Sequence, residues 1–272
     1  MIYGLYLSAA GVMASSYRQD VVANNLANSE TTGFKRDLAL FMQRPTEAQS
    51  RARAGGAGSS SALGPVEQGF GPGPTNPVLE GLGGGVLVAP TATDFAQGEL
   101  ESTGNPSDIA LMGKGFFAVQ SDGKQYLTRA GHLAVDSDGS LVLANGRHDR
   151  VLDKDLKPIT VDPRARFGVD KSGTITQDEK PTVRLALLDV PDPANLKKVG
   201  SDFFAAGDLA ALQPPTGNTR VQTGALERSN ADPTVELTHL MDAQRCLEAN
   251  ANMIRYQDET LQQLVNSVGK IS

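Results

Sequence analysis

The sequence is poor in the residues that usually carry redox, metal or membrane functions. Its 272 residues include one cysteine, no tryptophan and only 5% aromatic residues. A single cysteine excludes an intramolecular disulfide and a zinc site built from several thiolates. No apolar run approaches the roughly 20 residues that a membrane-spanning helix requires. We therefore expect neither a disulfide framework nor insertion into lipid.

Basic residues are fewer than acidic residues. There are 25 lysines and arginines against 31 acidic residues, which gives a formal net charge of −6. Nucleic acids and anionic membranes are bound by clustered positive charge. Nucleic acid is therefore not expected among the partners. The start of the chain has no basic residue ahead of its apolar stretch, so we expect no cleaved signal peptide.

Glycine and proline are plentiful, with 29 and 15 residues, and they divide the chain. The stretch 43–85 is rich in Gly, Pro and Ser and has no hydrophobic period, which predicts an extended linker. From Val86 onward, short apolar runs alternate with turn pairs such as Asp122-Gly123 and Asn145-Gly146. This spacing predicts antiparallel hairpins, with Val183 to Val190 as the longest strand.

Apolar residues at steps of three and four predict a helix at each end of the chain. The C-terminal helix has a clear start, since Asp232 can act as the N-cap and Pro233 as the first helical residue. Its apolar stripe continues for some 35 residues, a length typical of coiled coils or bundles. The N-terminal stripe consists of Ile2, Leu5, Ala9, Val12, Ser16, Gln19, Ala23 and Leu26.

These elements predict an α+β fold that is mainly β. Two long terminal helices would pack together as a coiled coil, with an antiparallel β domain between them. The expected divisions are 1–42 for the first helix and its turn, 43–85 for the linker, 86–223 for the β domain and 224–272 for the C-terminal helix.

The segment that follows the N-terminal helix, residues 23–36, is dense in turn-forming residues. Gly33 is expected to take a positive φ, which other residues adopt only at a cost. Phe34 would then anchor the turn in the core. Lys35 and Arg36 are expected to return the chain to water.

No set of catalytic or ligand-binding residues emerges. Residues 136–139 lack the glycine and glutamate spacing of a calcium loop, and residues 113–115 lack the rest of a phosphate-binding loop. The three histidines, His132, His148 and His239, are scattered along the chain. We therefore expect a protein that is not an enzyme and that binds no cofactor or metal.

Four stretches carry a resemblance to a known family. Residues 23–36 (Ala-Asn-Asn-Leu-Ala-Asn-Ser-Glu-Thr-Thr-Gly-Phe-Lys-Arg) are similar to the N-terminal signature of the bacterial flagellar axial family, which comprises the rod, hook and hook-associated proteins. Residues 105–119, residues 126–142 and the approach to the C-terminal helix, 224–245, resemble the same family. The similarity is weak over 151–219 and absent over 43–85.

The resemblance implies a structural subunit of the flagellar basal-body rod. Such subunits assemble with themselves and with other rod and hook proteins into a helical tube that transmits torque. The subunit would pass through the flagellar export apparatus and reach a rod that crosses the periplasm. The expected assembly interface consists of Leu5, Ala9, Val12, Ala23, Asn24, Asn25, Leu26, Asn28, Gly33, Phe34, Leu237, Met241, Leu247, Ala251, Ile254, Leu261, Val265 and Val268.

Three other interpretations remain open. The chain could be a short hook-type axial protein. It could be a secreted β-domain binding module that its helices oligomerise. It could also be a small hydrolase that uses the histidines, which an unchanged motility after their joint substitution would exclude.

Overall fold

The computed structural model describes residues 2–45, 85–165, 167–178, 180–207, 209, 212–215 and 219–268. Most of the expected linker, residues 46–84, lies outside this description. The chain divides into two compact units. The helix-and-ribbon unit comprises Met1–Val21, Ala39–Thr91 and His239–Ser272, and the β unit comprises Val22–Leu38 and Ala92–Thr238. The domain boundaries expected from the sequence remain predictions.

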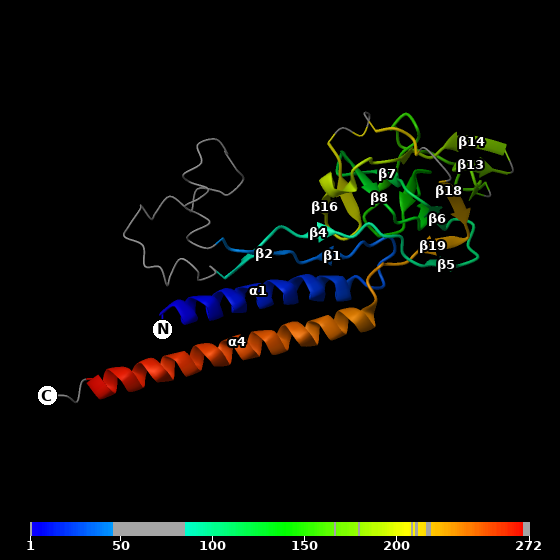
Figure 1. The fold of residues 1–272 in the computed structure, drawn as a ribbon. Helices are drawn as coiled ribbons and strands as arrows, with labels where there is room; N and C mark the ends of the chain where they lie inside the picture. The colour runs from blue at the N-terminus through cyan, green and yellow to red at the C-terminus, as the bar shows by residue number, and fades with distance from the viewer. Residues whose placement is uncertain are drawn as a thin grey trace, which may run out of the picture. The chain divides into compact units, whose positions relative to one another are not determined.

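Two long helices run side by side in opposite directions, α1 (Ile2–Ala27) and α4 (Pro233–Val268) (Figure 1). They approach closely where α1 carries glycine. A methyl group added to Gly4 would lie 2.9 Å from Gln257 Nε2, and one added to Gly11 would lie 2.9 Å from the Asn250 side chain. Both pairs are seven residues apart on their helices, as in a coiled coil. The prediction of two packed terminal helices is confirmed.

Helix α4 begins at Pro233, as the sequence predicts. Asp232 Oδ1 accepts a hydrogen bond from the Thr234 backbone N–H at 2.7 Å, and Pro233 is the first helical residue. An N-cap carboxylate satisfies backbone donors that have no partner within the helix. The helix then continues for 36 residues. Among the described helices, none has the length and apolarity to cross a membrane.

A two-stranded ribbon of β2 (Phe41–Gln43) and β3 (Val86–Val88) also belongs to the helix-and-ribbon unit. The rings of Tyr17 and Phe41 meet edge to face, with 6.5 Å between their centroids. Arg44 donates a hydrogen bond to the Tyr6 hydroxyl. The first helix therefore has the ribbon on one side and α4 on another.

The β unit is built around an eight-stranded antiparallel sheet. Its path is β16-β17-β8-β7-β11-β10-β9, and β15 pairs with β7 beside that path. The bounds are β7 (Phe116–Ser121), β8 (Lys124–Thr128), β9 (Leu133–Val135), β10 (Leu141–Leu143), β11 (Arg150–Val151), β15 (Leu187–Leu188), β16 (Lys197–Val199) and β17 (Phe203–Ala205).

The β unit also contains smaller antiparallel sheets. One has three strands, β12 (Phe167–Val169), β13 (Thr174–Gln177) and β14 (Lys180–Arg184). The others are pairs that join distant parts of the chain. They are β1 (Asp37–Leu38) with β4 (Ala92–Thr93), β5 (Leu100–Ser102) with β19 (Ala225–Glu227), and β6 (Ile109–Met112) with β18 (Arg220–Thr223). A short helix, η2 (Pro193–Asn195), also lies in this unit.

The hairpins form where the turn pairs predict them. Asp122 and Gly123 have φ angles of 50° and 75° between β7 and β8, as a two-residue hairpin turn requires. The inward side chains of the sheets form the core, in which Ile109, Leu141 and Ile175 are completely buried. The mainly antiparallel β domain expected from the sequence is confirmed.

The prediction of one long strand from Val183 to Val190 is wrong. The segment divides into the end of β14 and the short strand β15, and the longest strand among the described residues is β7, with six residues. Between them, the Leu185 N–H bonds to the Gly173 carbonyl and the Ala186 N–H bonds to the Leu152 carbonyl. The chain therefore changes partner sheets within a continuous apolar run, which periodicity alone cannot reveal.

Candidate assembly site

The turn after α1 is fixed by a glycine in close contact with two distant segments of the β unit. Gly33 has a φ of 72°, as expected from the sequence, and its N–H donates to the Glu227 carbonyl at 2.8 Å. A methyl group on Gly33 would lie 2.3 Å from the Ala130 backbone nitrogen. A side chain at this position is therefore excluded both by conformation and by space.

The residues after this glycine point into the protein. Phe34 is completely buried, as expected for an anchor. The prediction that Lys35 returns to water is wrong, because its side chain is only 1% exposed. Its Nζ donates to Glu227 Oε1 at 2.5 Å and to the Ala96 carbonyl at 2.8 Å. Arg36 is half-buried and forms an ion pair with Asp94, so its side chain also lies against the protein and does not extend into water.

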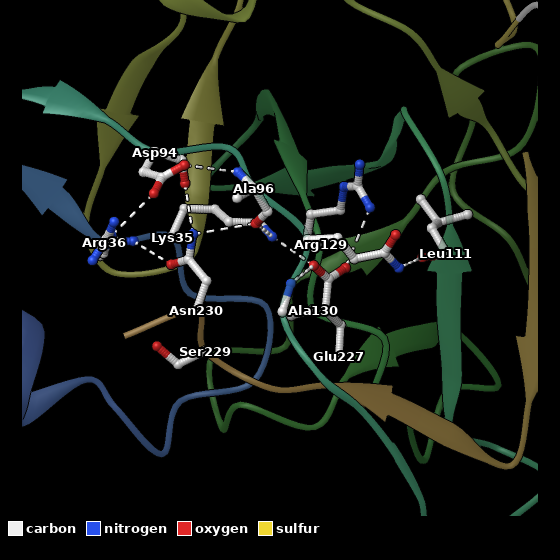
Figure 2. Close-up of polar contacts among 12 residues, drawn as sticks. Lys35, Arg36, Asp94, Ala96, Leu111, Arg129, Ala130, Glu227, Ser229 and Asn230 are labelled. Atoms are coloured by element: carbon white, nitrogen blue, oxygen red, sulfur yellow. Dashed lines mark hydrogen bonds and ion pairs between the residues drawn. The ribbon is translucent and has the colours of Figure 1, made fainter. Parts of the chain in front are cut away.

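Glu227 is the centre of a buried ion cluster, which we define as Lys35, Arg129 and Glu227 (Figure 2). Arg129 Nη1 lies 3.3 Å from Glu227 Oε2, and Arg129 Nη2 donates to the Gly113 carbonyl at 2.8 Å. The Gly98 N–H donates to Glu227 Oε1 at 3.0 Å. The carboxylate side chain has no exposed surface. Three segments distant in sequence thus meet at one carboxylate.

Two cations share this single carboxylate. Burial lowers the pKa of Lys35 and the pKa of Arg129, and the negative charge of Glu227 opposes both shifts. A buried charge is tolerated when it is paired and hydrogen-bonded, and it is costly when a partner is removed. The cluster therefore depends on the ionised carboxylate of Glu227.

A second set of bonds ties the segment after α1 to the segment before α4. The Arg36 N–H donates to Asn230 Oδ1 at 2.7 Å, and Asn230 Nδ2 donates to the Asp94 carbonyl at 2.8 Å (Figure 2). Arg36 Nε also lies 3.0 Å from Asp94 Oδ2. The backbone N–H of Ala96 and the guanidinium of Arg36 both lower the pKa of Asp94.

The last turn of α1 and the first turn of α4 meet at Asn25. Its Oδ1 accepts from the Asp37 N–H at 2.9 Å, and its Nδ2 donates to the Asp37 carbonyl at 2.8 Å. The same Nδ2 lies 3.5 Å from Glu236 Oε2, and Asn25 and Glu236 are both about 2% exposed. We call residues 22–38 and 227–238 the helix roots, because both helices leave the β unit from them.

The predicted interface residues differ in their exposure within the single chain. Those that are buried are Asn25, Gly33 and Phe34. Those that are half-buried are Leu5, Ala9, Val12, Leu26, Asn28, Leu247, Ala251, Ile254 and Leu261. Those that are exposed are Ala23, Asn24, Leu237, Met241 and Val265. The side chain of Val268 lies outside the described residues. Contact of these residues with other subunits remains a prediction.

Sequence reasoning did not assign a role to Glu227 or Arg129, although both lie in stretches that carry the family resemblance. No local signal identifies Glu227 as buried. It alternates with the apolar Leu226 in β19, so the sequence alone favours an outward glutamate, whereas the structure buries Ala225 and Glu227. No local signal indicates that its partner is Lys35, because that pairing joins residues 192 positions apart.

The histidines lie apart in the fold: His132 is in a β-bridge with Asp108, His148 is in the loop after β10, and His239 is within α4. His132 Nε2 is 3.9 Å from Asp108 Oδ1, and His148 Nδ1 is 3.2 Å from Asp136 Oδ2. Within the described residues, no three His, Cys, Asp or Glu side chains gather as a metal site would require. Buried polar side chains of the β unit, such as Asn25 and Glu227, instead form hydrogen bonds between distant segments of the chain.

Three family profiles match the chain, and together they cover most of both helices and part of the large sheet. Their descriptions are flagella basal body rod protein over residues 5–35, flagellar hook protein FlgE/F/G D1 domain over 110–177, and flagellar basal body rod FlgEFG protein C-terminal over 222–267. The first and third profiles contain the two helix roots almost completely.

Full-length relatives agree with these profiles. The chain is 32% identical to the flagellar basal-body rod protein FlgF of Caulobacter vibrioides, with 98% of each chain covered. The chain belongs to the flagellar basal-body rod protein family. It is also 31% identical to FlgG of Bacillus subtilis, over 98% of this chain and 99% of the relative. The hook-basal body complex protein FlhO of Bacillus subtilis is 29% identical over the full length of both chains.

Membership of this family makes the chain a structural rod subunit of the flagellar basal body. It also implies contact with other flagellar rod and hook proteins. The resemblance read from the sequence motifs is thereby confirmed.

Proposed function

We propose that this rod protein assembles with copies of itself and with other axial proteins into a helical tube that transmits torque. In this proposal, α1 and α4 form the inner wall, and the β unit forms the outer layer. The subunit crosses the flagellar export apparatus. It is not an enzyme, and neither nucleic acid nor lipid insertion has a part in its function.

The observation that carries the proposal is the apolar surface left on α4 by its pairing with α1. Tyr256 is 66% exposed, Val265 is 71% exposed, and Met253 is 53% exposed. Exposed apolar surface on this scale commonly marks an interaction site. A single helix pair leaves these side chains in water, whereas a tube of repeated subunits surrounds each helix with neighbours.

The pairing with α1 also buries little apolar area. The face of α1 toward α4 consists of small residues, since Gly4 and Gly11 contact α4 and the buried Ser8 and Ser15 lie one turn from them on the same face. Each square ångström of apolar surface contributes only about 25 cal/mol. We infer that packing between subunits supplies the remaining stabilisation of the helices.

A charge placed on α4 tests this proposal. In a strain that lacks the chromosomal copy, Leu247→Asp, Leu261→Asp and Tyr256→Asp are each expected to abolish swimming. An unpaired charge buried in a helix seam costs several kcal/mol. The matched control is Gln262→Asp, next to Leu261 in the exposed part of the same helix, which should swim better than any of the three variants.

Tyr256→Asp is the sharpest of these variants because its side chain is already in water in the single chain. Its monomer should therefore unfold at the same denaturant concentration as the unmodified protein, while basal bodies purified from the strain lack normal rods. Normal rods built from Tyr256→Asp and Leu261→Asp subunits would mean that α4 is not in the wall. A soluble monomer that binds a ligand and never polymerises would favour the alternative of a binding module.

A further inference from the structure

Lys198 lies on the outermost strand of the eight-stranded sheet, at the point where that sheet meets the root of α1. The strand β16 pairs only with β17 along the path of the sheet, so its outer side is an edge. The residue also lies between the segments 110–177 and 222–267 that match the family profiles. Neither the motifs nor the comparisons assign it a role.

Among the described residues, the ammonium group of Lys198 makes three contacts with the segment after α1. It donates to the Lys35 carbonyl at 2.6 Å and to Asp37 Oδ2 at 2.9 Å. It also lies 3.7 Å from the centroid of the Phe34 ring. A cation in this position is attracted to the negative face of the aromatic ring. Only 12% of the Lys198 side chain is exposed, so these contacts are largely shielded from water.

The contacts continue from Asp37 to both helices. The other oxygen of the Asp37 carboxylate, Oδ1, accepts from Thr93 Oγ1 at 2.9 Å, which fixes the side chain from the opposite side. The backbone of Asp37 is held by both ends of the Asn25 amide, and Asn25 Nδ2 reaches Glu236. One chain of hydrogen bonds thus runs from the sheet edge through α1 to the first turn of α4.

We propose that Lys198 is a positioning residue that holds the two helix roots in the arrangement needed for rod assembly. This inference rests on the proposed function, since it assigns to one residue the task of presenting the helices to neighbouring subunits. The ion cluster around Glu227 stabilises the interior of the β unit. Lys198 instead acts at the edge of the large sheet, beside the segment in which the chain passes from α1 through the turn into β1.

The test compares Lys198→Met with Lys197→Met in the full-length chain. The two lysines are neighbours on β16, but Lys197 is exposed and points to the opposite face of the strand. Hydrogen exchange of the monomer is measured over residues 22–38 and, as a reference for the fold, over residues 116–128. Lys198→Met should speed exchange in 22–38 by about tenfold or more, because hydrogen bonds to charged groups are the strong ones.

The reference segment should be unchanged in both variants, and Lys197→Met should leave both segments unchanged. Asp37→Asn removes the same ion pair, so the double variant with Lys198→Met should exchange no faster than the faster single variant. In cells, Lys198→Met should impair swimming, and Lys197→Met should not.

Two outcomes would overturn the inference. One is exchange in Lys198→Met that equals that of Lys197→Met. The other is an equal acceleration over 22–38 and 116–128, which would make Lys198 an ordinary stabilising residue. If instead the proposed function is wrong, deleting the whole gene leaves swimming intact, while Lys198→Met still loosens residues 22–38 of the purified protein.

Discussion

Glu227→Gln is expected to lower the free energy of unfolding of the β unit by about 3–5 kcal/mol, the usual cost of removing one partner from a buried ion pair. The substitution keeps the shape of the side chain and removes only its charge. Lys35 and Arg129 would then both lose their negatively charged partner, although both side chains are almost completely buried. Since small proteins are stable by only about 5–15 kcal/mol, such a loss is a large fraction of the total.

Urea denaturation of the full chain measures this effect, and Glu101→Gln is the matched control. Glu101 lies 3.7 Å from Arg228 in an ion pair whose side chains are both about half exposed. Exposed pairs contribute little to stability, so Glu101→Gln should unfold at nearly the urea concentration of the unmodified protein. Equal midpoints for the two variants would show that the ion cluster does not stabilise the β unit.

Gly33→Ala is the second substitution with a large expected effect. A residue other than glycine in this conformation costs about 1–3 kcal/mol. At Gly33 the new methyl group would also collide with the backbone of Arg129 and Ala130, at 2.6 and 2.3 Å. Backbone cannot move aside as a flexible side chain can. The variant should therefore lose both folding stability and swimming, and Gly33→Val should be worse still.

Gly123→Ala separates the cost of the backbone conformation from the cost of the steric collision. Gly123 has a φ of 75°, nearly that of Gly33, but no atom lies within 4 Å of an added methyl group. Gly123→Ala should therefore lose only the conformational part of the free energy of unfolding. Ser29→Ala is expected to be mild, because its hydroxyl bonds only to the Leu26 carbonyl one turn earlier. A loss at Gly33 no larger than that at Gly123 would contradict the close contact between the turn and the backbone of Arg129 and Ala130.

Local chemistry in the sequence is enough to predict much of this fold. The N-cap at Asp232, the hairpin at Asp122-Gly123 and the positive φ of Gly33 each depend on residues a few positions apart, and each is confirmed. These features follow from backbone hydrogen bonding and steric limits, which a short window of sequence contains.

The ion cluster could not be predicted in the same way. A lysine directly after a turn is usually solvated, and Lys35 is buried only because Glu227 arrives from the far end of the chain. The division of the apolar run 183–190 between two sheets has a similar cause, since its backbone donors find acceptors in segments that no local pattern identifies. Pairings between distant segments determine both features.

Hydrogen exchange on the purified monomer and on isolated basal bodies is the most direct test of the claim that this chain is a rod subunit stabilised by its neighbours. Ordering a residue costs about 1–2 kcal/mol of backbone entropy, and the glycine- and serine-lined face of α1 offers little apolar burial in return. We expect residues 2–21 and 239–268 to exchange rapidly in the dilute monomer and slowly in the rod. The sheet residues 109–143 should exchange slowly in both. Strong protection of both helices in a monomer at concentrations without oligomers would contradict the account, because the helix pair would then need no neighbouring subunits.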